Sequence, residues 1–91
     1  MKFIVTYELS PENRTPSGKR FLETKGAPPE GVTMLGRWHK AGGLAGYLLC
    51  ETSDAEAIAN WCYAWNDLLR FEIVPVIDDE QAGRVLSRSV G

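Results

Sequence analysis

The chain has few of the residues that most often carry recognisable chemistry. Its 91 residues include one histidine, His39, and two cysteines, Cys50 and Cys62. A structural zinc site takes four cysteine or histidine ligands in closely spaced pairs, so we expect no metal site. There is no CxxC pair, and both cysteines lie in predicted strand and helix interiors. We therefore expect two buried free thiols.

The chain also lacks an excess of positive charge and any long apolar run. Ten Lys and Arg residues stand against twelve Asp and Glu, and the basic residues are scattered. Nucleic-acid binding needs a clustered basic surface, so we expect no such partner. No apolar run approaches the ~20 residues of a membrane span. The first residues turn polar at Thr6, too early for a targeting segment. These features predict a cytoplasmic protein without a membrane partner, with a single domain over residues 1–91.

The chain does contain alternating strand and helix patterns. Residues 2–9 alternate with period two and predict a strand, and 32–40 and 44–51 predict two more, joined by a turn at 41–43. Residues 71–77 predict a fourth strand, which Pro75 places at a sheet edge because proline cannot donate to the ladder.

Helices are predicted between and after these strands. The first follows Ser10 and Pro11 and is clearest over 16–23, with Phe21 and Leu22 facing inward. The second opens with a capping box of Ser53 and Glu56. Its apolar stripe comprises Ile58, Trp61, Cys62, Trp65, Leu68 and Leu69. A short C-terminal helix follows a cap at Asp78 or Asp79. The order predicts an α+β, ferredoxin-like βαββαβ fold with a C-terminal helix, in which both main helices cover one face of a four-stranded antiparallel sheet.

The strand patterns also assign residues to two sheet faces. If Ala41 and Gly42 form a two-residue hairpin, Trp38 pairs with Ala45. We then expect Trp38 and Tyr47 to face the helices, beside Tyr7. A one-residue slip would swap the faces. The residues expected on the open face are Ile4, Thr6, Glu8, Leu35, Arg37, His39, Leu48, Cys50, Val74 and Val76. A face this apolar predicts a homodimer that pairs sheet on sheet, and the alternative is a solvated face with scattered apolar residues.

Three stretches resemble a bacterial family catalogued as domain of unknown function 3303. They are FIVTYELSPENR, PPEGVTMLGRWHKAGGLAGYLLCET and WCYAWNDLLRFEIVPVIDDEQA, and the resemblance runs from Met1 to Leu86. It implies membership of the wider dimeric α/β barrel group, which includes cofactor-independent monooxygenases, isomerases, haem-degrading enzymes and ligand-binding proteins. The family has no assigned activity, so the resemblance implies no catalytic residues.

Aromatic residues supply the candidate ligand-binding site. Pockets are typically lined by aromatic side chains with a few polar groups. The ligand-binding candidates are Tyr7, Trp38, Tyr47, Trp61, Trp65 and Asn66. The alternative interpretation is a packed aromatic core. Tyr7 and His39 are the candidates for proton transfer, although a lone histidine without a carboxylate partner is more often structural. Arg37 is expected to pair with Glu8 across the sheet, and an anionic ligand is the alternative.

Two functions fit these residues. The first is a homodimer that binds a small, largely apolar molecule or a protein partner without transforming it. The second is a cofactor-independent monooxygenase or isomerase that uses an aromatic-lined cavity. We expect no cofactor, because His39 is the only possible histidine ligand for haem and lies on a predicted strand.

Overall fold

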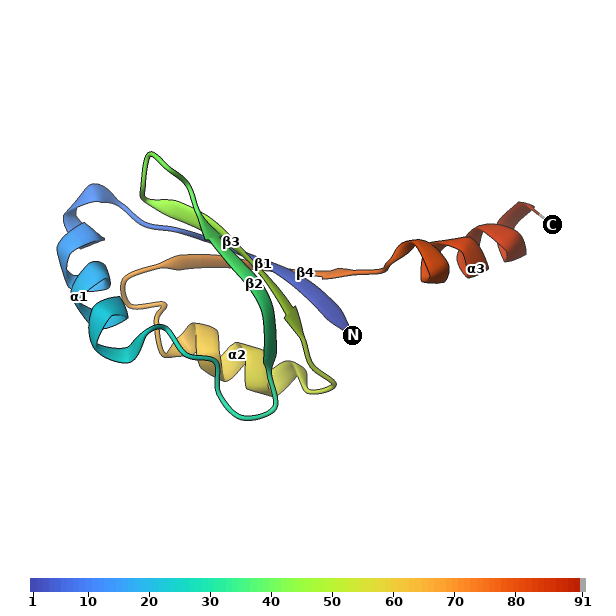
Figure 1. Ribbon diagram of the computed structural model, residues 1–91, viewed down its shortest axis with the longest axis horizontal. Coiled ribbons are helices and arrows are strands. Elements are labelled where there is room, and N and C mark those ends of the chain that lie inside the picture. Colours follow the sequence, from blue (N-terminus) through green and yellow to red (C-terminus); the bar gives the residue numbers. More distant parts are fainter. Residues whose placement is uncertain (91) are drawn as a thin grey trace.

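A computed structural model describes residues 1–90 and contains the four predicted strands in one antiparallel sheet (Figure 1). The strands are β1 (Lys2–Glu8), β2 (Thr33–His39), β3 (Ala45–Glu51) and β4 (Arg70–Val76). Their order is β2-β3-β1-β4, which is that of a ferredoxin-like fold. β4 lies at an edge, as Pro75 predicts.

The helices follow the predicted order, with shifted bounds. A 3-10 turn, η1 (Pro11–Asn13), leads into α1 (Arg14–Thr24). Leu22 of α1 is 80% exposed, so the prediction that it faces inward is wrong. α2 (Ala55–Tyr63) is capped by Asp54, whose side chain accepts a hydrogen bond from the Glu56 N–H, rather than by Ser53. α2 also ends earlier than its apolar stripe predicts, because turns hydrogen-bonded to the Trp65 carbonyl follow it.

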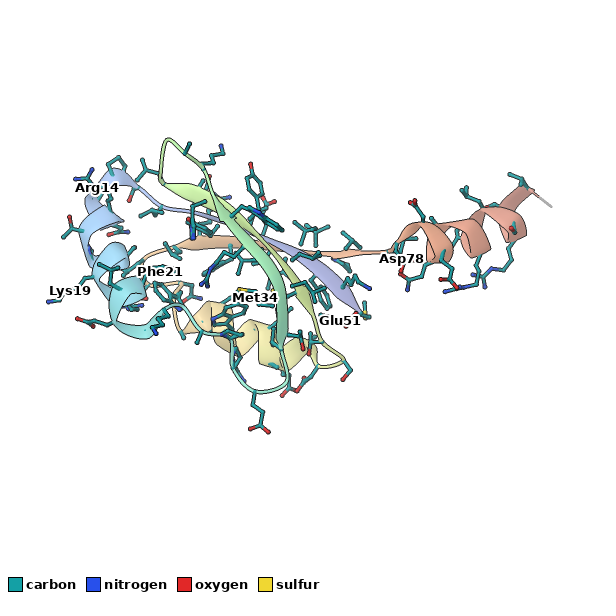
Figure 2. All side chains as sticks on the ribbon, in the orientation of Figure 1. Arg14, Lys19, Phe21, Met34, Glu51 and Asp78 are labelled. Atoms are coloured by element: carbon teal, nitrogen blue, oxygen red, sulfur yellow. The ribbon has the colours of Figure 1, made fainter. Side chains whose placement is uncertain are left out.

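The C-terminal helix α3 (Asp79–Val90) extends away from the sheet (Figure 1). It begins with a reciprocal cap: the Asp78 carboxylate accepts from the Gln81 N–H, and the Gln81 amide oxygen accepts from the Asp78 N–H, both at 2.9 Å. None of its described residues is buried. The side chains of α3 stand clear of the rest of the molecule (Figure 2).

The core lies between α2 and one face of the sheet. Its members are Phe3, Val5, Val32, Leu48, Cys50, Ala57, Ile58 and Cys62. Both cysteines are buried and free, as predicted. α1 contributes only one buried residue, the polar Ser17. α1 therefore does not seal the sheet in the way that α2 does.

The strand register corrects the predicted faces of the β2–β3 hairpin. Val5 pairs with Leu48, and Leu48 pairs with Arg37, so these three residues share the face that the helices cover. Trp38 pairs with Tyr47, and both lie on the open face. Val5 lies on the face predicted for it. The predicted placement of the other four residues, together with His39 and Cys50, is therefore wrong. Apolar residues occupy every position from Tyr47 to Cys50, so the sequence of β3 does not show which of its faces the helices cover. The register of β3 against β1 determines that face.

Two further expectations about this hairpin are corrected. The turn is longer than two residues, because His39 pairs with Gly46 and the Lys40 N–H donates to the Ala45 carbonyl at 2.8 Å. Glu8 lies 3.8 Å from Arg70 rather than near Arg37. Ile4, Thr6, Val74 and Val76 do share the open face, as predicted.

Candidate ligand-binding pocket

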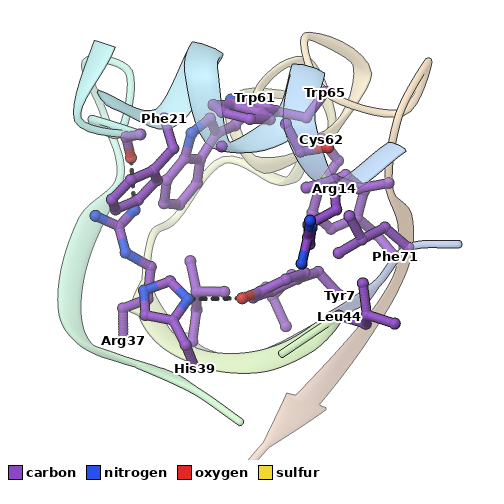
Figure 3. Close-up of a pocket in the computed structure, with 17 residues that line it drawn as sticks. Tyr7, Arg14, Phe21, Arg37, His39, Leu44, Trp61, Cys62, Trp65 and Phe71 are labelled. Atoms are coloured by element: carbon purple, nitrogen blue, oxygen red, sulfur yellow. Dashed lines mark hydrogen bonds between the residues drawn. The ribbon is translucent and has the colours of Figure 1, made fainter. Parts of the chain in front are cut away.

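A cavity of about 320 Å³ lies between α1, the region around α2, and the covered face of the sheet (Figure 3). Phe21 from α1, Trp61 and Trp65 from α2 and the following turn, and Phe71 from β4 supply aromatic surface. Other lining residues are Val5, Leu9, Leu44, Leu48, Cys62 and Leu69. Its volume and its apolar lining with few polar groups are typical of a small-molecule site.

The sequence of α1 explains why the cavity is present. Arg14, Ser17, Gly18 and Phe21 line the cavity at the i, i+3, i+4, i+7 spacing of one helical face. Two of these four, Ser17 and Gly18, are small, and a Cβ built on Gly18 meets no atom within 4 Å. The inner face of α1 therefore leaves open the space that a leucine or phenylalanine would fill.

Polar contacts, rather than apolar packing, hold α1 across this space. The Arg20 guanidinium donates to both carboxylate oxygens of Asp67 at 2.8 Å and to the Ala64 carbonyl at 3.0 Å. The Asn13 side-chain amide donates to the Leu68 carbonyl at 3.1 Å. These bonds join α1 to the turn after α2. Arg20 holds the pKa of the Asp67 carboxyl below its usual range, because the hydrogen bonds favour the charged carboxylate.

Arg37 fixes the other end of α1. Its guanidinium donates to the Gly26 carbonyl at 2.7 Å and to the Lys25 carbonyl at 2.9 Å, just past the C-terminus of the helix. The same group lies 4.8 Å from the centre of the Phe21 ring. A cation at a helix C-terminus also complements the helix dipole. The donors of Arg37 are therefore directed to the chain rather than to a ligand.

Tyr7 and His39 form the one side-chain pair that is directly hydrogen-bonded within the described lining. The Tyr7 hydroxyl lies 2.6 Å from His39 Nδ1 (Figure 3). Burial raises the pKa of Tyr7, and the nearby charge of Arg37 partly offsets the effect. Tyr7 is thus a neutral phenol near pH 7. Its hydroxyl donates when Nδ1 of His39 carries no proton and accepts when Nδ1 carries one, so the tautomer of His39 sets the direction of this hydrogen bond.

Gly46 makes this pair possible. It is the pairing partner of both Tyr7 in β1 and His39 in β2, so it lies between them on the covered face. A Cβ at Gly46 would overlap the Tyr7 ring. The absence of a side chain lets Tyr7 lie across β3 and reach His39.

The cysteines supply no reactive group to this site. Cys62 lines the cavity, and burial beside Cys50 raises the pKa of its thiol to about 11. Burial also raises the pKa of Cys50. Thiols rather than thiolates are present near pH 7, and the thiol is the weaker nucleophile. No cluster of three or more histidine, cysteine, aspartate or glutamate side chains suited to a metal occurs within residues 1–90.

The structure brings together only part of the predicted ligand-binding set. Tyr7, Trp61 and Trp65 line the cavity, and His39 joins them from the face to which it was not assigned. Trp38 and Tyr47 lie on the opposite side of the sheet, and Asn66 is exposed outside the lining. Sequence reasoning missed Arg14, Ser17, Phe71 and the role of Phe21. The helical spacing of residues 14, 17, 18 and 21 is the signal that would have found α1's contribution.

Fold and pocket together define a small ferredoxin-like domain with an apolar cavity between sheet and helices. The chain belongs to the family described as Domain of unknown function (DUF3303), whose model matches residues 1–90. No curated protein and no solved structure matches the chain. Within the described residues, no helix has the length and apolar character needed to cross a membrane.

Proposed function

We propose that the protein binds a small, largely apolar molecule in the cavity beneath α1. The observation that carries this proposal is an apolar cavity of about 320 Å³ in a domain of 91 residues. Protein interiors are normally close-packed, and an unfilled space deprives its lining of dispersion contacts. A ligand that fills the cavity restores those contacts.

Gly18 supports the proposal from the side of the helix. A glycine in a helix interior costs up to about 1 kcal/mol relative to alanine. Here the missing side chain would point into open space, so no clash requires it. The glycine lowers helix stability and widens the cavity, a combination that serves ligand binding rather than folding.

The test compares two matched glycine substitutions. Gly18→Leu should fill the cavity, whereas Gly83→Leu adds the same side chain in open space on α3, outside the lining. The probe is 2-naphthalenemethanol, whose ring system suits the cavity and whose binding changes the fluorescence of Trp61 and Trp65. We expect Gly18→Leu to weaken binding at least about tenfold, or about 1.4 kcal/mol, with Gly83→Leu within about twofold of the parent. Equal binding by all three proteins, or no binding by the parent, would contradict the proposal.

The proposal includes a homodimer formed through the open sheet face. Trp38 is 59% exposed there, Tyr47 46% and Val74 44%, and Ile4, Leu49 and Val76 are half-buried beside them. Contiguous apolar surface of this kind is typical of interfaces, and a twofold axis lets the same face cover itself. The cavity lies on the other side of the sheet, so dimerisation leaves it accessible.

A second candidate function is a cofactor-independent enzyme, a monooxygenase or isomerase, and the Tyr7–His39 hydrogen bond favours it. Tyr7 is half-buried at the cavity and His39 is exposed, so the pair joins the cavity to solvent. Such a pair can move a proton to or from a bound carbonyl compound.

The test of this second function is hydrogen–deuterium exchange at the α-carbon of 2-tetralone, followed by NMR. We expect Tyr7→Phe to slow exchange at least about tenfold with affinity within about twofold. Unchanged exchange in Tyr7→Phe would exclude this pair as the proton carrier.

A further inference from the structure

We propose that the ligand of this cavity carries one anionic group, such as a carboxylate, beside its apolar body, and that Arg14 binds that group. This inference rests on the proposed function, because it specifies the chemical class of molecule that the same cavity binds.

The charges around the cavity have one sign. Seventeen residues line it, and they include two arginines, Arg14 and Arg37, but no aspartate or glutamate. An amine-bearing ligand would meet two cations and no counter-charge, and the low dielectric of an apolar site would strengthen that repulsion. The lining therefore favours an anionic ligand over a cationic one.

Of the two arginines, Arg14 is available to a ligand. Arg37 donates to the Gly26 and Lys25 carbonyls and packs on Phe21. The guanidinium of Arg14 makes no hydrogen bond or ion pair with any residue in the described part of the chain. Its side chain is directed into the opening (Figure 3). A guanidinium presents a planar set of donors that matches a carboxylate, so a ligand carboxylate at this end would receive a charge-assisted, bidentate contact.

Ser17 is a second polar residue in the lining of the same cavity. Ser17 as a whole residue is only 8% exposed, and its hydroxyl oxygen has no hydrogen-bond partner among the residues described. Buried hydroxyl groups are nearly always hydrogen-bonded, so an unpartnered one calls for an explanation. Ser17 lies three residues after Arg14, on the same face of α1, and lines the same cavity. A carboxylate held by Arg14 would accept a hydrogen bond from the Ser17 hydroxyl and satisfy this group.

Three probes with one ring system and different charges test the inference. They are 2-naphthoate, 2-naphthalenemethanol and 2-naphthylmethylammonium, and their dissociation constants are measured at low and moderate salt. We expect the anion to bind at least about tenfold more tightly than the alcohol, with the cation weakest. The preference for the anion should fall as salt rises, because Arg14 is exposed at the opening.

Arg14→Met removes the charge but keeps an apolar side chain, and Ser17→Ala removes the hydroxyl. Arg14→Met should abolish the anion preference while the alcohol binds within about twofold of the parent, which also shows that the cavity is intact. Ser17→Ala should weaken naphthoate binding by about two- to fivefold and leave the alcohol unchanged. Lys19→Met is the matched control, because it makes the same charge change on the same helix at an exposed position outside the lining.

The outcomes separate this inference from the proposed function. Equal affinity for anion and alcohol, or a preference that survives Arg14→Met, would overturn the inference. So would a loss of preference in Lys19→Met as large as in Arg14→Met, since net charge alone would then explain it. In each of these cases, the apolar pocket is still supported if the parent protein binds 2-naphthalenemethanol and Gly18→Leu loses that binding. If none of the three probes binds the parent protein, the proposed function fails, and this inference fails with it.

Discussion

At the scale of single residues, the contact between Tyr7 and His39 depends on what Gly46 lacks. Gly46 separates the two residues in the sheet, and any Cβ there would overlap the Tyr7 ring. Gly46→Ala must therefore push Tyr7 away from His39 or shift the strands. We expect this substitution to destabilise the protein by about 1–3 kcal/mol, as is usual for overpacking, and to break the hydrogen bond.

The single histidine makes this prediction directly measurable. Nitrogen chemical shifts of the imidazole report which ring nitrogen carries the proton, and only His39 contributes such signals. We expect the contact with Tyr7 to hold the imidazole of the parent protein mainly in one tautomer, and Gly46→Ala to lose that preference. Gly42→Ala is the control, because its Cβ meets nothing within 4 Å and its stability should stay within about 0.5 kcal/mol. A Gly46→Ala protein with an unchanged tautomer would show that Tyr7 does not need the space over Gly46.

Residue patterns alone predicted some of these positions and missed others, for a physical reason. Phe3, Val5 and Tyr7 occupy alternate positions of β1, and their common face was correctly inferred. The assumed hairpin register grouped Arg37 and His39 with Leu48, and this group was assigned to the open face, yet it faces the helices. A polar residue can lie on a covered face when a cavity leaves room for it and main-chain carbonyls accept its hydrogen bonds. The hydrophobicity pattern of the sequence shows neither the cavity nor the carbonyls.

At the scale of elements, α1 differs from α2 in how it is attached. α2 contributes buried Ala57, Ile58 and Cys62 to the core, whereas α1 contributes only Ser17. The strong apolar stripe made α2 easy to predict. The weak stripe of α1 made its prediction less definite, and the same weakness produces the cavity. What looked like a poorly formed amphipathic helix is a helix whose inner face lines empty space.

The Arg20–Asp67 pair makes the attachment of α1 dependent on pH. The pKa of Asp67 is lowered in the folded protein from its ordinary value of 3.8, mainly by the hydrogen bonds from Arg20. The folded state therefore binds this proton less readily than the unfolded state does. Its contribution to stability is present above the ordinary pKa and is lost as the pH falls through the lower, folded-state value.

We expect Asp67→Asn to lower the free energy of unfolding at pH 7 and to flatten its dependence on pH below 4. Urea unfolding of the parent, Asp67→Asn, Arg20→Met and the double variant, repeated between pH 2.5 and 7, measures both effects. The double variant should lose less than the sum of the single losses, because the two side chains interact. Additive losses, or equal acid dependence in the parent and Asp67→Asn, would show that the pair does not stabilise α1. Glu56→Gln, an exposed carboxylate on α2, is the control for a general charge effect.

At the scale of the whole molecule, two apolar surfaces are left uncovered. One is the open sheet face around Trp38 and Tyr47. The other is the stripe on α3, where Val85 is 48% exposed, Leu86 59% and Val90 85%. Because α3 extends from the edge strand, one chain spans 53 Å in its longest direction and only 18 Å in its shortest. Two such surfaces on an elongated chain support the proposal that it pairs with a second copy.

A charge placed on the open face tests the homodimer. Trp38→Glu would bring a carboxylate and its twofold copy into a desolvated interface, and burying an unpaired charge is strongly unfavourable. We expect the parent protein to elute with twice the 10.1 kDa mass of the chain in light-scattering chromatography, and Trp38→Glu to elute with the single mass. Tyr63→Glu is the matched control, because Tyr63 is a 76% exposed aromatic residue on α2, outside the sheet, and should leave the dimer intact. A parent protein of single mass at micromolar concentration would mean that the open sheet face does not pair with a second copy.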